Sequence, residues 1–176
     1  MFISSKQSEG ECGRKGFYLL EVLAVEVATE ENEKITVITA YVPPFIGAWT
    51  RASHEDMQNE TLQTLEKLTR GSNRILPCGG FNCKEVDWEG MKSGCEEGSW
   101  GAKVFSQMTE NALYQHIREP TRVRGEDNPS RLVFTRKEEE IDITMGSPLG
   151  KSDHVVVACD VWLKYGRESI VPNQRQ

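Results

Sequence analysis

The chain lacks any apolar run long enough to cross a membrane, and its first residues lack the basic and apolar regions of a signal peptide. It also lacks a Cys-x-x-Cys pair. Its five cysteines are odd in number, which favours neither a disulfide framework nor a zinc ribbon. We therefore expect an intracellular protein, nuclear or cytoplasmic, with reduced thiols and no membrane partner.

A positive net charge is absent as well. The formal charge is −6, so the chain is unsuited to coating nucleic acid nonspecifically, and any basic surface must be local. One segment, 118–137, does have more basic than acidic residues. It is either a solvated, salt-bridged loop or part of a nucleic-acid-binding surface. Its basic residues are Arg118, Arg122, Arg124, Arg131, Arg136 and Lys137.

Neither an internal repeat nor a low-complexity linker is present, which favours one domain with one core. Alternating and β-branched apolar residues predict strands, and apolar residues at helical spacing predict helices between them. Pro77 is awkward in its strand, because proline removes a ladder donor. The pattern indicates an α/β layered fold. The predicted strands are 17–27, 35–42, 74–79, 114–117, 132–135 and 153–163, and the helices are 55–69 and 100–112.

A polar group stands at the start of the last predicted strand. Lys151-Ser152-Asp153-His154 directly precedes the run 155–159, which is typical of a buried strand. An Asp-His pair in this place suits a phosphodiesterase site, because the carboxylate can orient the imidazole and the ring can face a phosphate oxygen. A solvent-exposed dipeptide without a function is the alternative.

Four motifs follow one another along the chain in an order that is more specific than any one of them. Together they resemble the endonuclease/exonuclease/phosphatase superfamily and, more narrowly, the endonuclease domain of LINE-type (non-LTR) retrotransposon polyproteins. The resemblance covers residues 17–163, with 1–16 poorly matched and 164–176 a polar tail. The motifs are Tyr41-Val42-Pro43-Pro44, Gly79-Gly80-Phe81-Asn82 with Val86-Asp87-Trp88 after it, Glu119-Pro120-Thr121-Arg122, and 148–154, which ends in Asp153-His154.

The resemblance implies a partial four-layer α/β sandwich and Mg²⁺-assisted hydrolysis of DNA phosphodiesters. It implies that the nick primes reverse transcription by the reverse transcriptase region of a parent polyprotein. By the same resemblance, Tyr41 and His154 contact the scissile phosphate, and Asn82 positions the attacking water or the phosphate. Asp153 orients His154 and helps to hold the metal. Residues expected to contact nucleic acid are Arg122, Arg124 and Lys151.

Local sequence leaves other roles open for two of these residues. Tyr41 could simply fill the edge of the sheet, and Asn82 could be a turn asparagine after two glycines. We expect Tyr41, Asn82 and His154 to converge at one end of the sheet, because each follows or ends a predicted strand.

Several carboxylates that the resemblance leads us to expect are missing. Gly80 stands where the family has the aspartate that activates water, and 131–134 lacks an aspartate that the family has there. The metal-binding glutamate lies on N-terminal strands with no counterpart in 1–15. Neighbouring acids are expected outside the site, namely Asp87, Asp142 and the hairpin tip Glu138-Glu139-Glu140. We therefore expect weak Mg²⁺ binding, slow or absent cleavage, and a poorly covered apolar face near 17–27.

Three hypotheses about function remain. The chain could be an active Mg²⁺-dependent DNA endonuclease, or a truncated and catalytically impaired remnant that binds nucleic acid through 118–137. The third is a small-molecule phosphatase of the same superfamily. The missing carboxylates favour the second hypothesis.

Overall fold

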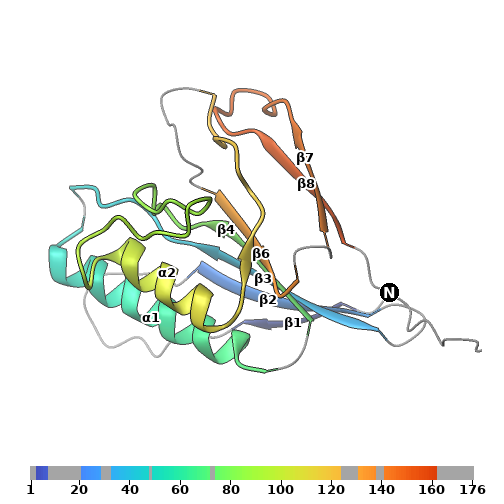
Figure 1. Ribbon diagram of the computed structural model, residues 1–176, viewed down its shortest axis with the longest axis horizontal. Coiled ribbons are helices and arrows are strands. Elements are labelled where there is room, and N and C mark those ends of the chain that lie inside the picture. Colours follow the sequence, from blue (N-terminus) through green and yellow to red (C-terminus); the bar gives the residue numbers. More distant parts are fainter. Residues whose placement is uncertain are drawn as a thin grey trace, which may run out of the picture.

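The computed structural model describes residues 3–7, 21–28, 33–47, 49–71, 74–123, 131–137 and 141–161, with the backbone alone for 3–7. Six strands form one mixed sheet in the order β1-β2-β3-β4-β6-β5, and β7 and β8 form a second sheet (Figure 1). The elements in chain order are β1 (Ile3–Gln7), β2 (Glu21–Ala28), β3 (Lys34–Tyr41), α1 (Arg51–Thr69), β4 (Arg74–Gly80), α2 (Trp100–Glu110), β5 (Tyr114–Gln115), β6 (Arg131–Thr135), β7 (Ile141–Gly146) and β8 (Val156–Val161).

The α/β fold predicted from the sequence is confirmed. Figure 1 shows α1 and α2 along one face of the six-stranded sheet and the β7–β8 pair on the other. Each interface has its own buried cluster. On the helical side Ile38, Leu65 and Phe134 are fully buried, and on the other side Ile35, Val133 and Ile141 pack together. The described residues therefore form three layers: helices, large sheet and small sheet.

Strands β3 and β4 are parallel, and α1 connects them. A parallel pair needs such a crossover, and it brings the carboxyl ends of both strands to the same edge of the sheet. The antiparallel neighbours β2 and β6 begin at this edge. The edge therefore collects the ends of β3 and β4 and the starts of β2 and β6.

Helix α1 begins four residues before its predicted start. The Thr50 hydroxyl accepts a hydrogen bond from Ser53 N at 3.1 Å, which satisfies a donor that the first turn leaves without a partner. The apolar spacing begins later, and so the periodicity missed this polar first turn. Helix α2 has the same kind of cap, with Ser99 accepting from Ala102 N at 3.4 Å.

Pro77 lies in the middle of β4 and is buried. The ladder between β4 and β6 covers only Cys78 to Gly80. The N–H that proline lacks therefore falls outside that ladder, and the strand continues through it.

The expectation that 155–159 forms a buried strand is wrong. The strand β8 begins at Val156, and all its residues are half-buried or exposed. Within the described residues, β7 is the only strand that pairs with β8, and one face of the pair packs on the larger sheet. The valines of β8 are therefore covered only on the face that packs on the larger sheet.

A poorly covered apolar face was expected near 17–27. On β2, Leu23 is 43% exposed but Val25 and Val27 are half-buried, and 17–20 lie outside the described residues. The outer edge of β2 is paired, because β1 from the poorly matched segment 1–16 runs antiparallel to it. Arg124, the hairpin tip 138–140 and the tail 164–176 lie outside the described residues. In the part of the chain that is described, neither helix is both long and apolar enough to span a membrane.

Candidate functional site

Three residues at the common edge of the large sheet lie side by side. The register pairs Tyr41 at the end of β3 with Gly80 at the end of β4, and Gly80 with Arg131 at the start of β6. Directly paired residues project from the same face of a sheet. This face is the one that packs against β7 and β8. We call Tyr41, Gly80 and Arg131 the strand-end row.

The loop after β4 is anchored to the hydrophobic core by its first residue. Phe81 is fully buried and meets Phe134 edge-on with ring centroids 5.9 Å apart, and its carbonyl accepts a hydrogen bond from Trp100 Nε1 at 2.6 Å. These contacts place the next residue, Asn82, just beyond the strand end. Asn82 has a φ of 48°, which asparagine tolerates better than most residues.

The amide of Asn82 is tied to the end of β3. Its Nδ2 donates to the Val42 carbonyl at 2.6 Å, and Val42 N donates to the Gly80 carbonyl at 2.8 Å. Asn82 therefore acts as a turn asparagine that holds the two strand ends together. This contact leaves its side-chain oxygen, an acceptor, for other partners.

Two segments far apart in sequence, 121–123 and 153–155, pair in an antiparallel manner beside the row. Val123 N donates to the Asp153 carbonyl at 2.9 Å, and Val155 N donates to the Thr121 carbonyl at 3.1 Å. The hydroxyl of Thr121 is buried and accepts from Arg131 N at 3.2 Å. Thr121 thus joins the Glu-Pro-Thr-Arg motif, the start of β6 and the Asp-His motif.

The imidazole of His154 is held between a cation and an anion. Arg131 Nε donates to His154 Nδ1 at 3.3 Å, and His154 Nε2 lies 3.8 Å from Asp153 Oδ1. In this contact Nδ1 is the acceptor, which assigns the ring proton to Nε2. Asp153 also lies 3.3 Å from Arg122 Nε, an ion pair without a well-aligned hydrogen bond. Asp153 is therefore shared between an arginine and the histidine.

Lys151 lies in the tight turn that presents the Asp-His pair. Ser152 N donates to the Leu149 carbonyl at 3.1 Å, and Gly150 has a φ of 60°. The Ser152 hydroxyl accepts from His154 N at 3.1 Å. Lys151 is exposed on this turn.

Gly79 is required by a backbone neighbour, whereas Gly80 meets a side chain that can shift. A Cβ on Gly80 would lie 3.0 Å from Tyr41 Cδ2, so the tyrosine ring covers the place where a longer side chain would project. A Cβ on Gly79, which has a φ of 139°, would lie 1.9 Å from the Ala40 carbonyl oxygen. The two glycines let β3 and β4 approach at the site.

The residues present do not fit a Mg²⁺ ion. This ion needs near-octahedral oxygen ligands that include at least one or two carboxylates. Asp153 is already paired with Arg122, and Gly80 has no side-chain oxygen. Asp87 accepts from Gly90 N at 2.8 Å in a separate turn. No cluster of three or more His, Cys, Asp or Glu residues suited to a metal occurs in the described ranges.

The structure thus brings Tyr41, Asn82, Asp153 and His154 to one edge of the sheet, with Arg122 and Lys151 on the same side. Sequence reasoning did not single out Arg131 as a member of the site. It considered this residue only as one of the basic residues of segment 118–137. Its position as the first residue of a strand was the available signal.

Solved structures share this architecture. Three of them have TM-scores of 0.56, 0.56 and 0.50 and identities of 20%, 13% and 16%, and each match covers 80% of this chain. They are, respectively, the endonuclease domain of TRAS1, a telomere-specific non-LTR retrotransposon, the 3′ phosphatase NExo from Neisseria bound to a product DNA hairpin, and an AP endonuclease from Archaeoglobus fulgidus.

The chain shares the fold of these three structures. It spans 61% of the length of the TRAS1 domain and 64% of each of the other two chains. No model of a protein family and no curated protein matches the sequence.

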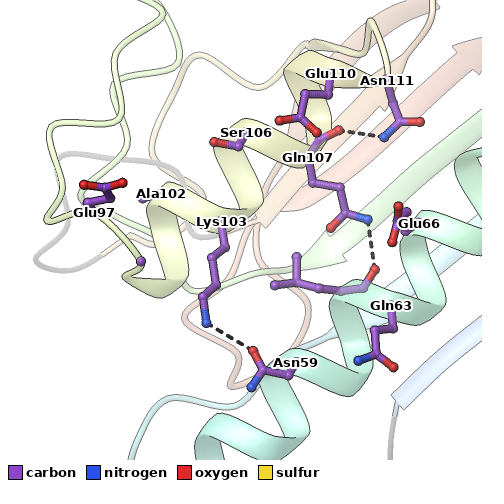
Figure 2. Close-up of a pocket in the computed structure, with 12 residues that line it drawn as sticks. Asn59, Gln63, Glu66, Glu97, Ala102, Lys103, Ser106, Gln107, Glu110 and Asn111 are labelled. Atoms are coloured by element: carbon purple, nitrogen blue, oxygen red, sulfur yellow. Dashed lines mark hydrogen bonds between the residues drawn. The ribbon is translucent and has the colours of Figure 1, made fainter.

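A groove of about 550 Å³ lies between α1 and α2, on the helical side of the large sheet. Figure 2 shows Gln107 reaching from α2 to the Leu62 carbonyl of α1, and Lys103 reaching Asn59. Three glutamates and one lysine line the groove, so its charge repels a phosphate. The strand-end row is therefore the better candidate for a phosphodiester. The glutamates are Glu66, Glu97 and Glu110.

Proposed function

We propose that the chain is a retrotransposon-derived endonuclease-like domain that binds DNA at the strand-end row and cleaves phosphodiesters slowly or not at all. One observation carries the proposal: Arg131 joins the row to His154, so that a tyrosine, a guanidinium and an imidazole face one place at the edge of the sheet.

Each of these groups has a use at a phosphodiester. A guanidinium matches phosphate oxygens with two parallel N–H donors, and a tyrosine hydroxyl donates one hydrogen bond. His154 has its Nε2 proton available for a further acceptor, because the contact to Asp153 is long at 3.8 Å. The four motifs that resemble the LINE-type endonucleases meet at the same place, which favours DNA over other phosphodiesters.

The openness of the site favours a polymer over a small phosphate ester. Tyr41 is 44% exposed, and Asp153 is exposed as well. Pockets for small ligands usually enclose most of the ligand's surface. A duplex can lie across an open edge and be held by contacts to successive phosphates.

Slow cleavage follows from the donor set. General-base catalysis contributes roughly a hundredfold to ten-thousandfold in rate. Gly80 offers no base, and the Asp153 carboxylate is shared with Arg122 and His154. The site can hold a phosphate and polarise it, but the described residues offer no unpaired carboxylate beside the His154 ring to activate water.

A plasmid-nicking assay tests the activity part of this proposal. We expect at most a trace of nicked circles with Mg²⁺, and its loss on His154→Ala. His116→Ala is the matched control, because His116 is also half-buried and contacts Thr135 at 2.7 Å away from the site. Robust Mg²⁺-dependent nicking by the unmodified chain would contradict the impaired-enzyme part and support an active nuclease.

Binding is tested separately by fluorescence anisotropy with a labelled DNA duplex. The affinity should fall with rising salt, because phosphate contacts release counterions. It should weaken on Arg122→Ala and stay unchanged on Arg51→Ala, an exposed arginine on α1. Absence of salt-sensitive binding would contradict the proposed function itself.

A further inference from the structure

The guanidinium of Arg131 has fewer partners than that of the nearby Arg122. The only hydrogen bond of this guanidinium among the described residues is from Nε to His154, and no described carboxylate lies within ion-pair distance. Its terminal nitrogens have no partner in the same ranges, and the residue is exposed. Arg122, by contrast, is already paired with Asp153. A fork of N–H donors with a free end is the group that binds a phosphate in a bidentate manner.

The position of Arg131 places this charge where a phosphate would lie. Arg131 is paired with Gly80 and lies two strands from Tyr41, on the face of the sheet next to the His154 ring. With strands roughly 4.8 Å apart, the Tyr41 and Arg131 backbones are separated by about 10 Å. A phosphodiester group with its flanking sugars can bridge that span.

Counted over the described residues around His154, the charge of the site is positive without a metal. Asp153 is offset by Arg122, the His154 ring accepts a hydrogen bond from Arg131 at Nδ1, and Arg131 is left as a net positive charge. Glu21 lies beside the row, paired with Tyr41. It lies three strands from Arg131, about 14 Å away at the backbone, which is too far to neutralise it in water.

A divalent cation beside Arg131 would be repelled by it and would find one shared carboxylate as a ligand. The missing carboxylates and the presence of Arg131 act in the same direction, since both disfavour a metal and favour an anion. We propose that this site binds a backbone phosphate of nucleic acid directly through the Arg131 guanidinium, without a divalent cation. The proposal rests on the proposed function and specifies how the same site recognises its substrate.

The test is the affinity for a labelled DNA duplex, measured by anisotropy at constant ionic strength with Mg²⁺ or with chelator. We expect the two dissociation constants to agree within about twofold, because no metal bridges protein and phosphate. Arg131→Ala should weaken binding by about tenfold or more, the usual effect of losing a charge-assisted hydrogen bond. It should also reduce the slope of log affinity against log salt by about one.

Two further variants separate charge recognition from folding. Arg131→Lys keeps the charge but loses the fork, so its affinity should lie between those of the unmodified chain and Arg131→Ala. Arg70→Ala is the matched control, because Arg70 is exposed, pairs with Glu66 and follows the last residue of α1, far from the site. It should leave both affinity and salt slope unchanged.

The outcomes distinguish this inference from the function on which it rests. Binding that requires Mg²⁺, or that Arg131→Ala affects no more than Arg70→Ala, would overturn the inference and leave the proposed DNA binding standing. Displacement of the duplex by inorganic phosphate at a concentration no higher than that of the duplex, at constant ionic strength, would also overturn it, since the site would then prefer free phosphate. Failure to bind DNA under either condition would overturn both.

Discussion

The ring of Tyr41 lies across the backbone of Gly80, with Cδ2 3.0 Å from the position that a Cβ on Gly80 would take. A contact this short has to relax before any side chain can be accommodated. The ring and the missing aspartate are therefore linked: the space in which a carboxylate would begin is limited by the tyrosine that is expected to contact the phosphate.

Gly80→Asp should consequently restore little cleavage. The new carboxylate would displace the Tyr41 ring and would lie opposite Arg131, its partner in the ladder. Residues opposite each other on antiparallel strands have Cβ atoms roughly 5 Å apart, so the two charges would pair. We expect nicking to rise only marginally and DNA affinity to fall, because the guanidinium would be occupied. Plasmid nicking and anisotropy measure the two effects.

Gly80→Ala separates the steric effect from the charge effect. It moves the tyrosine ring without pairing Arg131, and so DNA affinity should fall less than in Gly80→Asp. A strong gain in Mg²⁺-dependent nicking by Gly80→Asp would show that the remaining ligands suffice for a metal.

Gly79→Ala should destabilise the chain far more than a change at another glycine with the same backbone conformation. Gly79 has a φ of 139° and a Cβ would lie 1.9 Å from the Ala40 oxygen, whereas Gly71 has a φ of 140° and open space around it. Gly71→Ala should therefore cost only the backbone strain, about 1–3 kcal/mol. Gly79→Ala should cost more than ~4 kcal/mol, or prevent folding. Urea denaturation gives both free energies of unfolding, and equal losses would contradict the close approach of β3 and β4.

The sequence predicted most of the elements but not the contacts between them. Apolar spacing located α2, β3 and β6 to within about two residues at most ends, because each buries a continuous face. It missed the first turn of α1, which lacks apolar spacing and is stabilised by the capping hydroxyl of Thr50. It also overestimated the burial of β8, since a run of valines does not reveal how many strands will flank it.

For the candidate site, the sequence predicted that Tyr41, Asn82 and His154 would meet at one edge of the sheet, because each follows or ends a predicted strand. The partnership of Arg131 with His154 could not be predicted in the same way. It depends on the register of β6 against β4, which are separated by helix α2 and long loops, and on the turn that precedes β8. Both are tertiary features without a local signal.

Cys83 should resist alkylation in the folded chain. It is 1% exposed, and burial, together with the nearby Glu85 carboxylate, raises the pKa of its thiol to about 12. The thiolate is the reactive form, and at pH 8 only about one thiol in ten thousand would be ionised at any moment, so alkylation would be slow even if the thiol were reachable. Cys159 is half-buried and serves as the internal control. Mass spectrometry after iodoacetamide treatment should find Cys83 modified last, and only after denaturant is added; equal labelling would contradict the packing of the loop after β4.

Thr121→Val should loosen the site while leaving every charged group in place. The buried Thr121 hydroxyl accepts from Arg131 N at 3.2 Å, and valine keeps the shape but removes this acceptor. An unsatisfied buried donor costs about 1–3 kcal/mol, so the free energy of unfolding should fall by that amount. Thr64→Val, a half-buried threonine on α1, is the control and should change stability by less than about 0.5 kcal/mol.

If Thr121 positions Arg131, DNA affinity should also fall in Thr121→Val at temperatures where the variant is fully folded, although no phosphate contact has been removed. The salt slope should remain that of the unmodified chain, because the number of charges at the phosphate is the same. A reduced slope would show instead that the substitution removes a charged contact with the phosphate, and unchanged affinity would show that Arg131 needs no support from Thr121.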